Sequence, residues 1–122
     1  MSVFFNEIHY DNSGTDSGEA IEIAGTAGTD LTGWQIVLYN GSNGQAYDTR
    51  TLSGVIADQD HGFGALSFSY PANGIQNGPP DAFALVDPEG HVVQFLSYEG
   101  VFTATNGPAD RKSTRLNSSH GY

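Results

Sequence analysis

The chain has no cysteine, only four Lys and Arg residues, no sustained helical periodicity and no long apolar run. Without cysteine, disulfides and thiolate metal sites are excluded, and so are the common Cys/His zinc patterns. The apolar runs are far shorter than the roughly 20 residues that cross a membrane, so we expect no membrane insertion. The first residues, MSVFFNEIHY, lack the basic and apolar regions of a signal peptide.

The few bases are unevenly distributed. Residues 1–110 contain all 14 acids and a single base, Arg50, which gives this body a formal charge of −13. The other bases lie in residues 111–122, which carry a charge of +3. So acidic a body repels phosphate backbones and anionic lipids, and we expect no direct nucleic-acid binding. Its acidity fits a soluble or secreted module, and it serves either solubility alone or the binding of cations.

Residues 111–122 differ from the preceding chain in charge, lysine use and periodicity. The sequence KSTRLNSSHGY resembles translated sequencing-adaptor read-through, which ends many truncated metagenomic reading frames. We therefore predict one native domain over residues 1–110, followed by a non-native or disordered tail over residues 111–122. On this interpretation the domain is a piece of a longer protein.

What the chain does contain is the regular spacing of turn residues that is typical of an all-β protein. Glycine makes up 16 of the 122 residues, and it recurs with Asn, Asp and Pro between short apolar runs. We expect about 7–9 short, mostly antiparallel strands, which form either a sandwich or a barrel. The clearest turn signals are Asn-Gly within 40–44 and Asp-Pro-Glu-Gly at 87–90. Three prolines make residues 71–81 a crossing loop. The expected strands are 4–10, 20–24, 34–39, 45–51, 64–70, 82–86 and 92–96, with a short strand or corner at 55–56 and an extension over 98–102.

The opening segment NEIHYDNSGTDSGEAIEI, residues 6–23, predicts two antiparallel strands joined by a polar loop. If the loop is symmetric, residues whose numbers sum to 29 face each other. The expected pairs are Ile8 with Ile21 and Asn6 with Ile23 on the buried face, and Glu7 with Glu22 on the other face. Because like charges directly opposite are destabilising, we expect exposure, a raised pKa or a cation to compensate.

The acids of this segment are the candidate metal ligands. Calcium takes six to eight oxygen ligands in a flexible geometry, and a loop rich in Asp, Asn, Ser and Thr supplies them. The spacing does not match an EF-hand. The alternative is that the aspartates cap turns while the glutamates lie in water. The candidate calcium ligands are Glu7, Asp11, Asp16, Glu19 and Glu22.

No catalytic signature accompanies these acids. The chain lacks a G-x-S-x-G elbow and a G-x-x-x-x-G-K-[ST] loop. His9, His61 and His91 have no second histidine at ligand spacing, although His61 could pair with a neighbouring carboxylate. We therefore expect no catalytic activity of its own.

The aromatic residues allow two interpretations. Trp34 opens an alternating strand, which favours packing in the core over stacking on a ligand. The tyrosines form a platform for a sugar or a protein if several share one sheet face, or they pack half-buried at sheet edges. These tyrosines are Tyr39, Tyr47, Tyr70 and Tyr98.

Four segments resemble the bacterial lamin-tail domain: NEIHYDNSGTDSGEAIEI at 6–23, DLTGW at 30–34, YPANGIQNGPPDAFALVD at 70–87 and VVQFLSYEG at 92–100. The resemblance covers roughly residues 3–108. It implies an immunoglobulin-like β-sandwich, usually one module of a secreted or surface-attached protein beside nucleases, phosphatases or other hydrolases. It therefore implies an extracellular or cell-surface location.

The function that this resemblance implies is that of a non-catalytic accessory module. Such a module targets or docks its host protein to a surface, a polymer or a protein partner. Two alternatives remain open. One is a calcium-stabilised carbohydrate-binding module, which needs cation ligands and an aromatic platform. The other is a fragment of an extracellular nuclease or hydrolase whose active site lies outside this chain.

Overall fold

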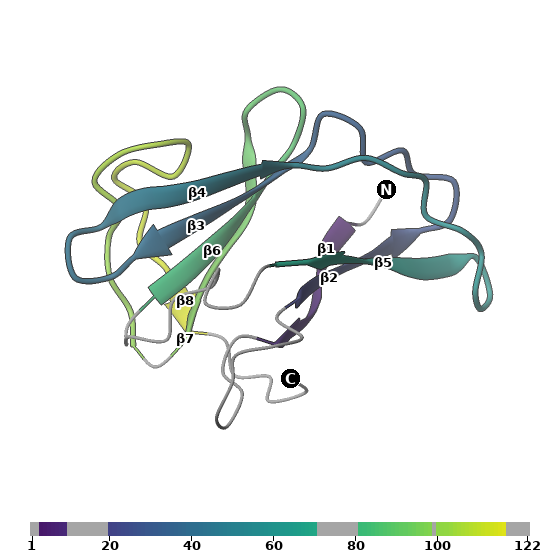
Figure 1. Cartoon of the computed structure of the whole chain (residues 1–122), viewed down its shortest axis with the longest axis horizontal. Coiled ribbons are helices and arrows are strands. Elements are labelled where there is room, and N and C mark those ends of the chain that lie inside the picture. The colour runs from purple at the N-terminus through teal and green to yellow at the C-terminus, as the bar shows by residue number, and fades with distance from the viewer. Residues whose placement is uncertain (1–2, 10–19, 71–80, 99, 117–122) are drawn as a thin grey trace. The chain divides into compact units, whose positions relative to one another are not determined.

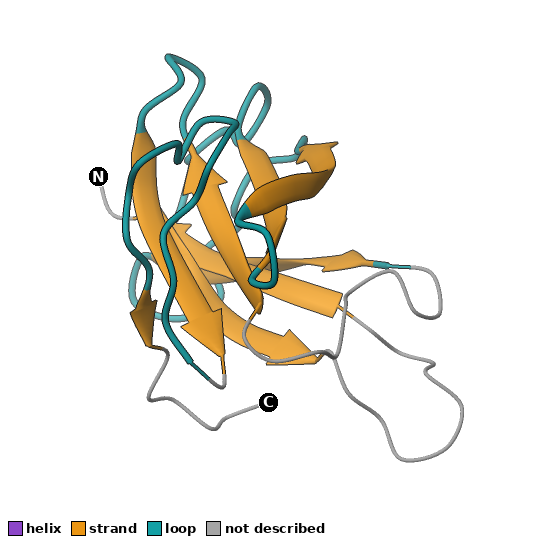
Figure 2. Ribbon diagram, turned by 90° about the vertical axis from the view of Figure 1, so that its left-hand side faces the viewer, coloured by secondary structure: helices purple, strands orange, loops and turns teal. Residues whose placement is uncertain are grey.

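The computed structural model describes residues 3–9, 20–70, 81–98 and 100–116. These residues form eight strands and no helix. Figures 1 and 2 draw the strands as arrows. The predicted all-β class is therefore confirmed, and the described part of the chain has no helix that could cross a membrane. The strands are β1 (Val3–His9), β2 (Ala20–Thr26), β3 (Gln35–Asn40), β4 (Gln45–Thr51), β5 (Phe63–Ser69), β6 (Asp81–Val86), β7 (Val92–Tyr98) and β8 (Arg115–Leu116).

The strands form two sheets, one in each of two compact units. The first unit takes its described residues from Met1–Thr32 and Ser53–Asn77, and its sheet has the order β1-β2-β5. The second unit takes them from Gly33–Leu52 and Gly78–His120, and its sheet has the order β4-β3-β6-β7-β8. All pairs are antiparallel except β7 with β8.

The first sheet pairs β2 with strands from both sides of the sequence. β2 alternates between buried and half-buried residues, with Ile21 and Ile23 fully buried, as its period-two pattern requires. β5 lies antiparallel to β2 without any register shift. After β2 the chain runs beside residues 54–56, where Gly28 N–H donates to the Ile56 carbonyl at 2.7 Å. The corner expected at residues 55–56 is thus an isolated bridge between Asp30 and Val55.

A β-bulge divides the β1–β2 register. From Glu7 onward the pairing is as predicted, and Glu7 lies opposite Glu22. The expected pairing of Asn6 with Ile23 is wrong, because Phe5 takes the place opposite Ile23. Asn6 is the extra residue of the bulge and is exposed, whereas Phe5 is buried. An inserted residue flips the alternation of all preceding residues, which is why the symmetric-loop argument fails at this point.

The second sheet contains the two hairpins that the turn signals predict. β3 and β4 are joined at Asn40–Gly44, where Gly44 has a φ of +73° and donates its N–H to the Asn40 carbonyl. β6 and β7 are joined by Asp87–His91, with Gly90 at a φ of +89°. Positive φ is inexpensive only for glycine, which explains its place in both turns.

Both faces of the central strands β3 and β6 are buried, where alternation predicted one buried face. All six residues of β6 are buried, and so are Ile36 to Tyr39 of β3. One face is covered within the unit by residues 102–109, whose buried Ala104 and Ala109 join the core cluster. That cluster consists of Val37, Tyr39, Ala82, Ala84, Val86, Phe95, Ala104 and Ala109.

The covering segment is held by hydrogen bonds. The Tyr39 hydroxyl donates to the Asn106 carbonyl at 2.9 Å and accepts from Ala109 N–H at 3.0 Å. Residues 111–116 continue this segment: Thr103 and Ser113 form an isolated bridge, and Arg115–Leu116 pairs with β7. The proposed boundary at residue 110 stays a prediction.

Candidate functional site

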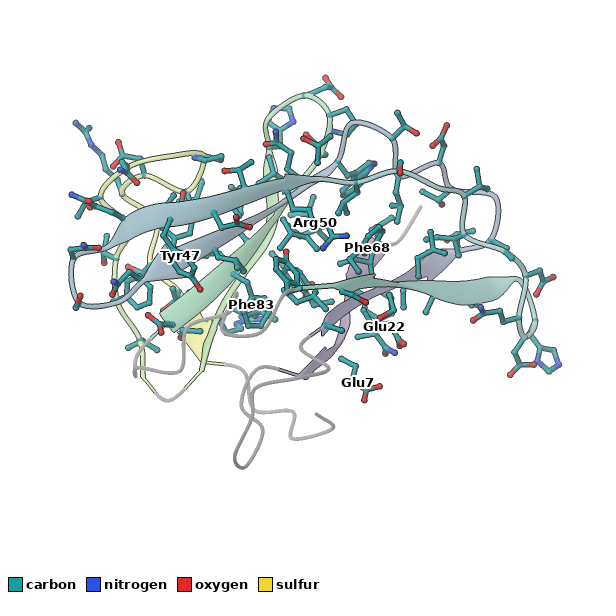
Figure 3. The ribbon with its side chains drawn as sticks, in the orientation of Figure 1. Glu7, Glu22, Tyr47, Arg50, Phe68 and Phe83 are labelled. Atoms are coloured by element: carbon teal, nitrogen blue, oxygen red, sulfur yellow. The ribbon has the colours of Figure 1, made fainter. Side chains whose placement is uncertain are left out.

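The half-exposed face of the first sheet carries two of the five predicted calcium ligands. Glu7 of β1 and Glu22 of β2 are direct cross-strand partners, as predicted, and Figure 3 shows their side chains near one another. Directly opposed residues have Cβ atoms about 5 Å apart, close enough for one cation to contact both carboxylates. The remaining candidates, Asp11, Asp16 and Glu19, lie outside the described residues.

The bulge residue supplies a contact that sequence reasoning missed. The Asn6 side-chain amide donates a hydrogen bond to the Glu22 carboxylate. The bulge turns Asn6 to the exposed face, where its amide supplies a donor beside two acids. Part of the expected compensation for the opposed acids therefore comes from an amide. The signal in the sequence is Asn directly before Glu7 in a strand whose apolar spacing is irregular.

Two cross-strand rows extend this face to β5. In one row Glu7, Glu22 and Ser67 are aligned, and in the next row Phe4, Ala24 and Ala65 are aligned. Phe4 is 37% exposed, and Ser67 is exposed. The face therefore presents carboxylates and a hydroxyl beside one aromatic ring and small apolar side chains. We call these six residues with Asn6 the acid-pair face.

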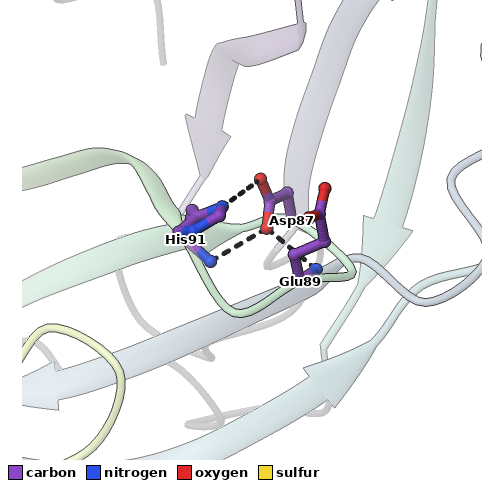
Figure 4. A network of polar contacts seen from close by, with 3 residues as sticks. All are labelled: Asp87, Glu89 and His91. Atoms are coloured by element: carbon purple, nitrogen blue, oxygen red, sulfur yellow. Dashed lines mark hydrogen bonds and ion pairs between the residues drawn. The ribbon is translucent and has the colours of Figure 1, made fainter.

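A second group of polar side chains lies on the β6–β7 turn, drawn in Figure 4. Asp87 Oδ1 accepts the N–H of Glu89 at 3.0 Å and the N–H of His91 at 2.8 Å. Asp87 Oδ2 lies 3.3 Å from Nδ1 of His91. The Asp-Pro-Glu-Gly turn therefore folds around the Asp87 carboxylate, a use of Asp that is frequent in turns.

The same contacts determine the charge state of Asp87. The hydrogen bond from His91 N–H lowers the pKa of Asp87 below its ordinary value, and the bond from Glu89 N–H and the nearby imidazole act in the same direction. Partial burial opposes them but does not outweigh them. Asp87 is therefore ionised over a wider pH range than a free aspartate.

The turn can also present metal ligands, a property that the sequence analysis did not predict for His91. One ligand atom each from Asp87, Glu89 and His91 lie within 4.8 Å of one another. The i, i+2, i+4 spacing of acid, acid and imidazole across a tight turn is the signal that could have indicated it. Because Glu89 and His91 are exposed and Asp87 is already engaged by the turn, the geometry is explained without a metal.

The other candidate residues are dispersed. His61 Nδ1 forms an ion pair with its neighbour Asp60, as the sequence allowed, and both side chains are exposed. Trp34 is half-buried. Tyr39 is fully buried and Tyr70 is nearly so, which removes both from any exposed aromatic platform. The side chain of Tyr98 is outside the described structure.

An open cavity of about 290 Å³ lies along β7 in the second unit. It is lined by Val92, Val93, Gln94, Phe95, Leu96, Lys112, Ser113 and Arg115. Both of its bases come from residues 111–122, the segment predicted to be non-native. The cavity therefore does not enter the functional interpretation.

Comparison of the chain with protein-family models gives no match. Comparisons with curated proteins and with solved structures give none either.

Proposed function

We propose that this chain is a non-catalytic accessory module of a larger extracellular or surface-attached bacterial protein. In this proposal it is an immunoglobulin-like β-sandwich of the lamin-tail type, as the sequence resemblance implies. Its function is to dock the host protein to a polymer, a surface or a protein partner, and the acid-pair face is the docking surface.

The observation that carries the proposal is the alignment of two rows on one half-exposed sheet face. Carboxylates, an amide and a hydroxyl can bond to the hydroxyls of a sugar or to the backbone of a partner, and Phe4 can pack against their apolar parts. A sheet face of this composition suits an extended ligand. In contrast, the imidazoles with described side chains, His61 and His91, lie exposed on turns with their own carboxylate partners.

The test is retention of the purified chain on insoluble polysaccharides and on immobilised extracellular proteins. We expect retention that is reduced at least tenfold in the double variant Glu7→Gln and Glu22→Gln. The matched control is Asp48→Asn with Asp110→Asn, which removes two exposed acids elsewhere. Equal retention of both double variants, or no retention of the wild type on any surface, contradicts the proposed docking face.

A parallel assay addresses the enzyme alternative. Hydrolysis of a phosphodiester or phosphomonoester substrate by the purified chain, lost on changing Asp87 or His91, contradicts the accessory role. The accessory role predicts no turnover above buffer.

The opposed pair Glu7 and Glu22 specifically favours a second candidate, a calcium-stabilised carbohydrate-binding module. A ligand that binds only the native state raises the free energy of unfolding with the logarithm of its concentration relative to Kd, and the melting temperature rises with it. This candidate predicts a higher Tm in CaCl₂ than in NaCl of equal ionic strength. The gain disappears in the Glu7→Gln and Glu22→Gln variant and persists in the Asp48→Asn and Asp110→Asn control. A Tm that follows ionic strength alone contradicts it.

A further inference from the structure

In the part of the chain that the structure describes, the outer strands of the two sheets are β1, β5, β4 and β8. An outer strand exposes backbone N–H and C=O groups, which form a template for another chain unless the strand is bulged, charged, very short or covered.

Three of the outer strands carry a recognised protective feature. β1 has the bulge at Asn6 and the charge of Glu7. β4 has a register shift at Tyr47 and the charged residues Asp48 and Arg50. Within the described residues, β8 is two residues long.

β5 has none of these features. Its sequence FGALSFS contains no charge and no proline, and its register with β2 is continuous over all seven residues. Strands of this kind are the ones that pair with other chains. Among the described residues, β5 is the last strand of its sheet.

The preceding loop covers this edge instead. The backbone N–H groups of Gln59 and Asp60 donate to the Phe63 carbonyl at 2.8 and 3.0 Å, and Phe63 N–H donates back to the Asp60 carbonyl at 3.0 Å. Residues of a strand alternate in the direction of their backbone groups. Ala65 therefore presents its N–H and C=O to the same side as Phe63.

The Gln59 side chain meets these two groups. Its Oε1 accepts from Ala65 N–H at 3.1 Å, and its Nε2 donates to the Ala65 carbonyl at 3.3 Å. A primary amide carries the same donor and acceptor as a peptide unit. The Gln59 side chain thus extends the hydrogen bonding between the loop and β5 from Phe63 to Ala65.

We propose that the Gln59 side chain caps the edge of β5 and prevents a second copy of this chain from adding there as a strand. A second copy is the partner that fits best, because antiparallel pairing of one strand with itself is two-fold symmetric. Self-pairing of β5 opposes no charged residues, whereas self-pairing of β1 or β4 involves Glu7, or Asp48 and Arg50.

The test measures the mass of the full chain by size-exclusion chromatography with light scattering, over a range of concentrations. The Gln59→Ala variant is expected to double in mass with rising concentration, with slower amide exchange at Ala65 and Ser67. The wild type and the control Gln45→Ala, which alters an exposed glutamine of β4, are expected to stay monomeric.

A rescue variant separates edge pairing from nonspecific aggregation. Lysine on an outer strand opposes pairing, so adding Ser67→Lys to Gln59→Ala is expected to restore the monomer. If Gln59→Ala does not fold, Gln59→Glu carries the same test, because its carboxylate accepts from Ala65 N–H but cannot donate to the carbonyl. Any of three results overturns the proposal. These are a Gln59→Ala or Gln59→Glu variant that stays monomeric, an association that Ser67→Lys leaves unchanged, and a wild type already paired through β5.

Discussion

Tyr39 is the residue that joins the central strand β3 to the segment covering it. Its ring is fully buried beside Phe95, at a centroid distance of 5.2 Å, and its hydroxyl makes two hydrogen bonds to that segment. Changing Tyr39 to Phe keeps the ring but leaves the buried N–H of Ala109 without this acceptor. We expect a loss of about 1–3 kcal/mol in the free energy of unfolding, measured by urea denaturation. An unchanged free energy contradicts this role.

Titration of the Tyr39 hydroxyl should make the free energy of unfolding depend on pH in the alkaline range. Burial raises the pKa of Tyr39 above its ordinary value, against the opposing effect of the hydrogen bond from Ala109. A raised pKa contributes stability that is complete below the unfolded value of about 10 and is lost as the pH rises through the folded pKa. The difference in stability between the wild type and Tyr39→Phe should therefore shrink above about pH 10. A constant difference across that range contradicts the titration of Tyr39.

Titration of Asp87 should make the stability depend on pH in the opposite direction, in the acidic range. Because hydrogen bonding to His91 N–H lowers its pKa, it contributes stability above the unfolded value of about 3.9, and this is lost as the pH falls through the folded pKa. We expect Asp87→Asn to lower Tm at neutral pH and to lose that deficit in acid. Asp48→Asn, which removes an exposed acid of β4, controls for the loss of one charge. Equal deficits in both variants at every pH contradict the prediction.

At the scale of the elements, β5 depends on a close approach by its own preceding loop. A Cβ placed on Gly64 would lie 1.9 Å from the Ala57 carbonyl oxygen. Changing Gly64 to Ala must therefore displace the loop that carries Gln59, and we expect a cost of about 1–3 kcal/mol in urea denaturation. Ser67→Ala on the same strand is the control and should stay within about 0.5 kcal/mol of the wild type. Equal costs for the two variants contradict the close approach.

The strands were largely predictable, because turn chemistry and alternation are local. β4 has the predicted limits, and Asn-Gly and Asp-Pro-Glu-Gly mark the two hairpin turns. The features that the sequence did not predict depend on contacts between residues that are distant in the chain. A count of opposed residues cannot locate the bulge at Asn6. The burial of one face of β3 depends on a covering segment whose Asn106 and Ala109 lie 67 and 70 residues beyond Tyr39. The β2–β5 pairing also has no local signal.

The candidate site was predictable to the same extent. The pairing of Glu7 with Glu22 follows from the loop between them, so the sequence was sufficient. The Asn6 donor follows from the bulge and was missed. The gathering of Asp87, Glu89 and His91 requires knowing how the turn folds around one carboxylate, which composition alone does not reveal.

For the whole molecule, the dominant quantity is the net charge of −10. Self-repulsion of like charges destabilises a compact state, and salt screens it beyond a Debye length of about 10 Å at 0.1 M. We expect Tm to rise with NaCl. The Asp48→Asn and Asp110→Asn variant should melt higher at low salt and respond less. A Tm that is independent of NaCl contradicts this prediction.

The spacing of paired strands along the chain has a kinetic consequence. Short turns connect β3 with β4 and β6 with β7. In contrast, β2 can pair with β5 only after the long segment between Thr26 and Phe63 has folded back. The entropy of closing a loop grows with its length, so sequence-local pairs form first. The two hairpins should therefore assemble early, and the uncharged FGALSFS segment should wait longest for its native partner. During that interval a nascent chain is most exposed to association with its neighbours.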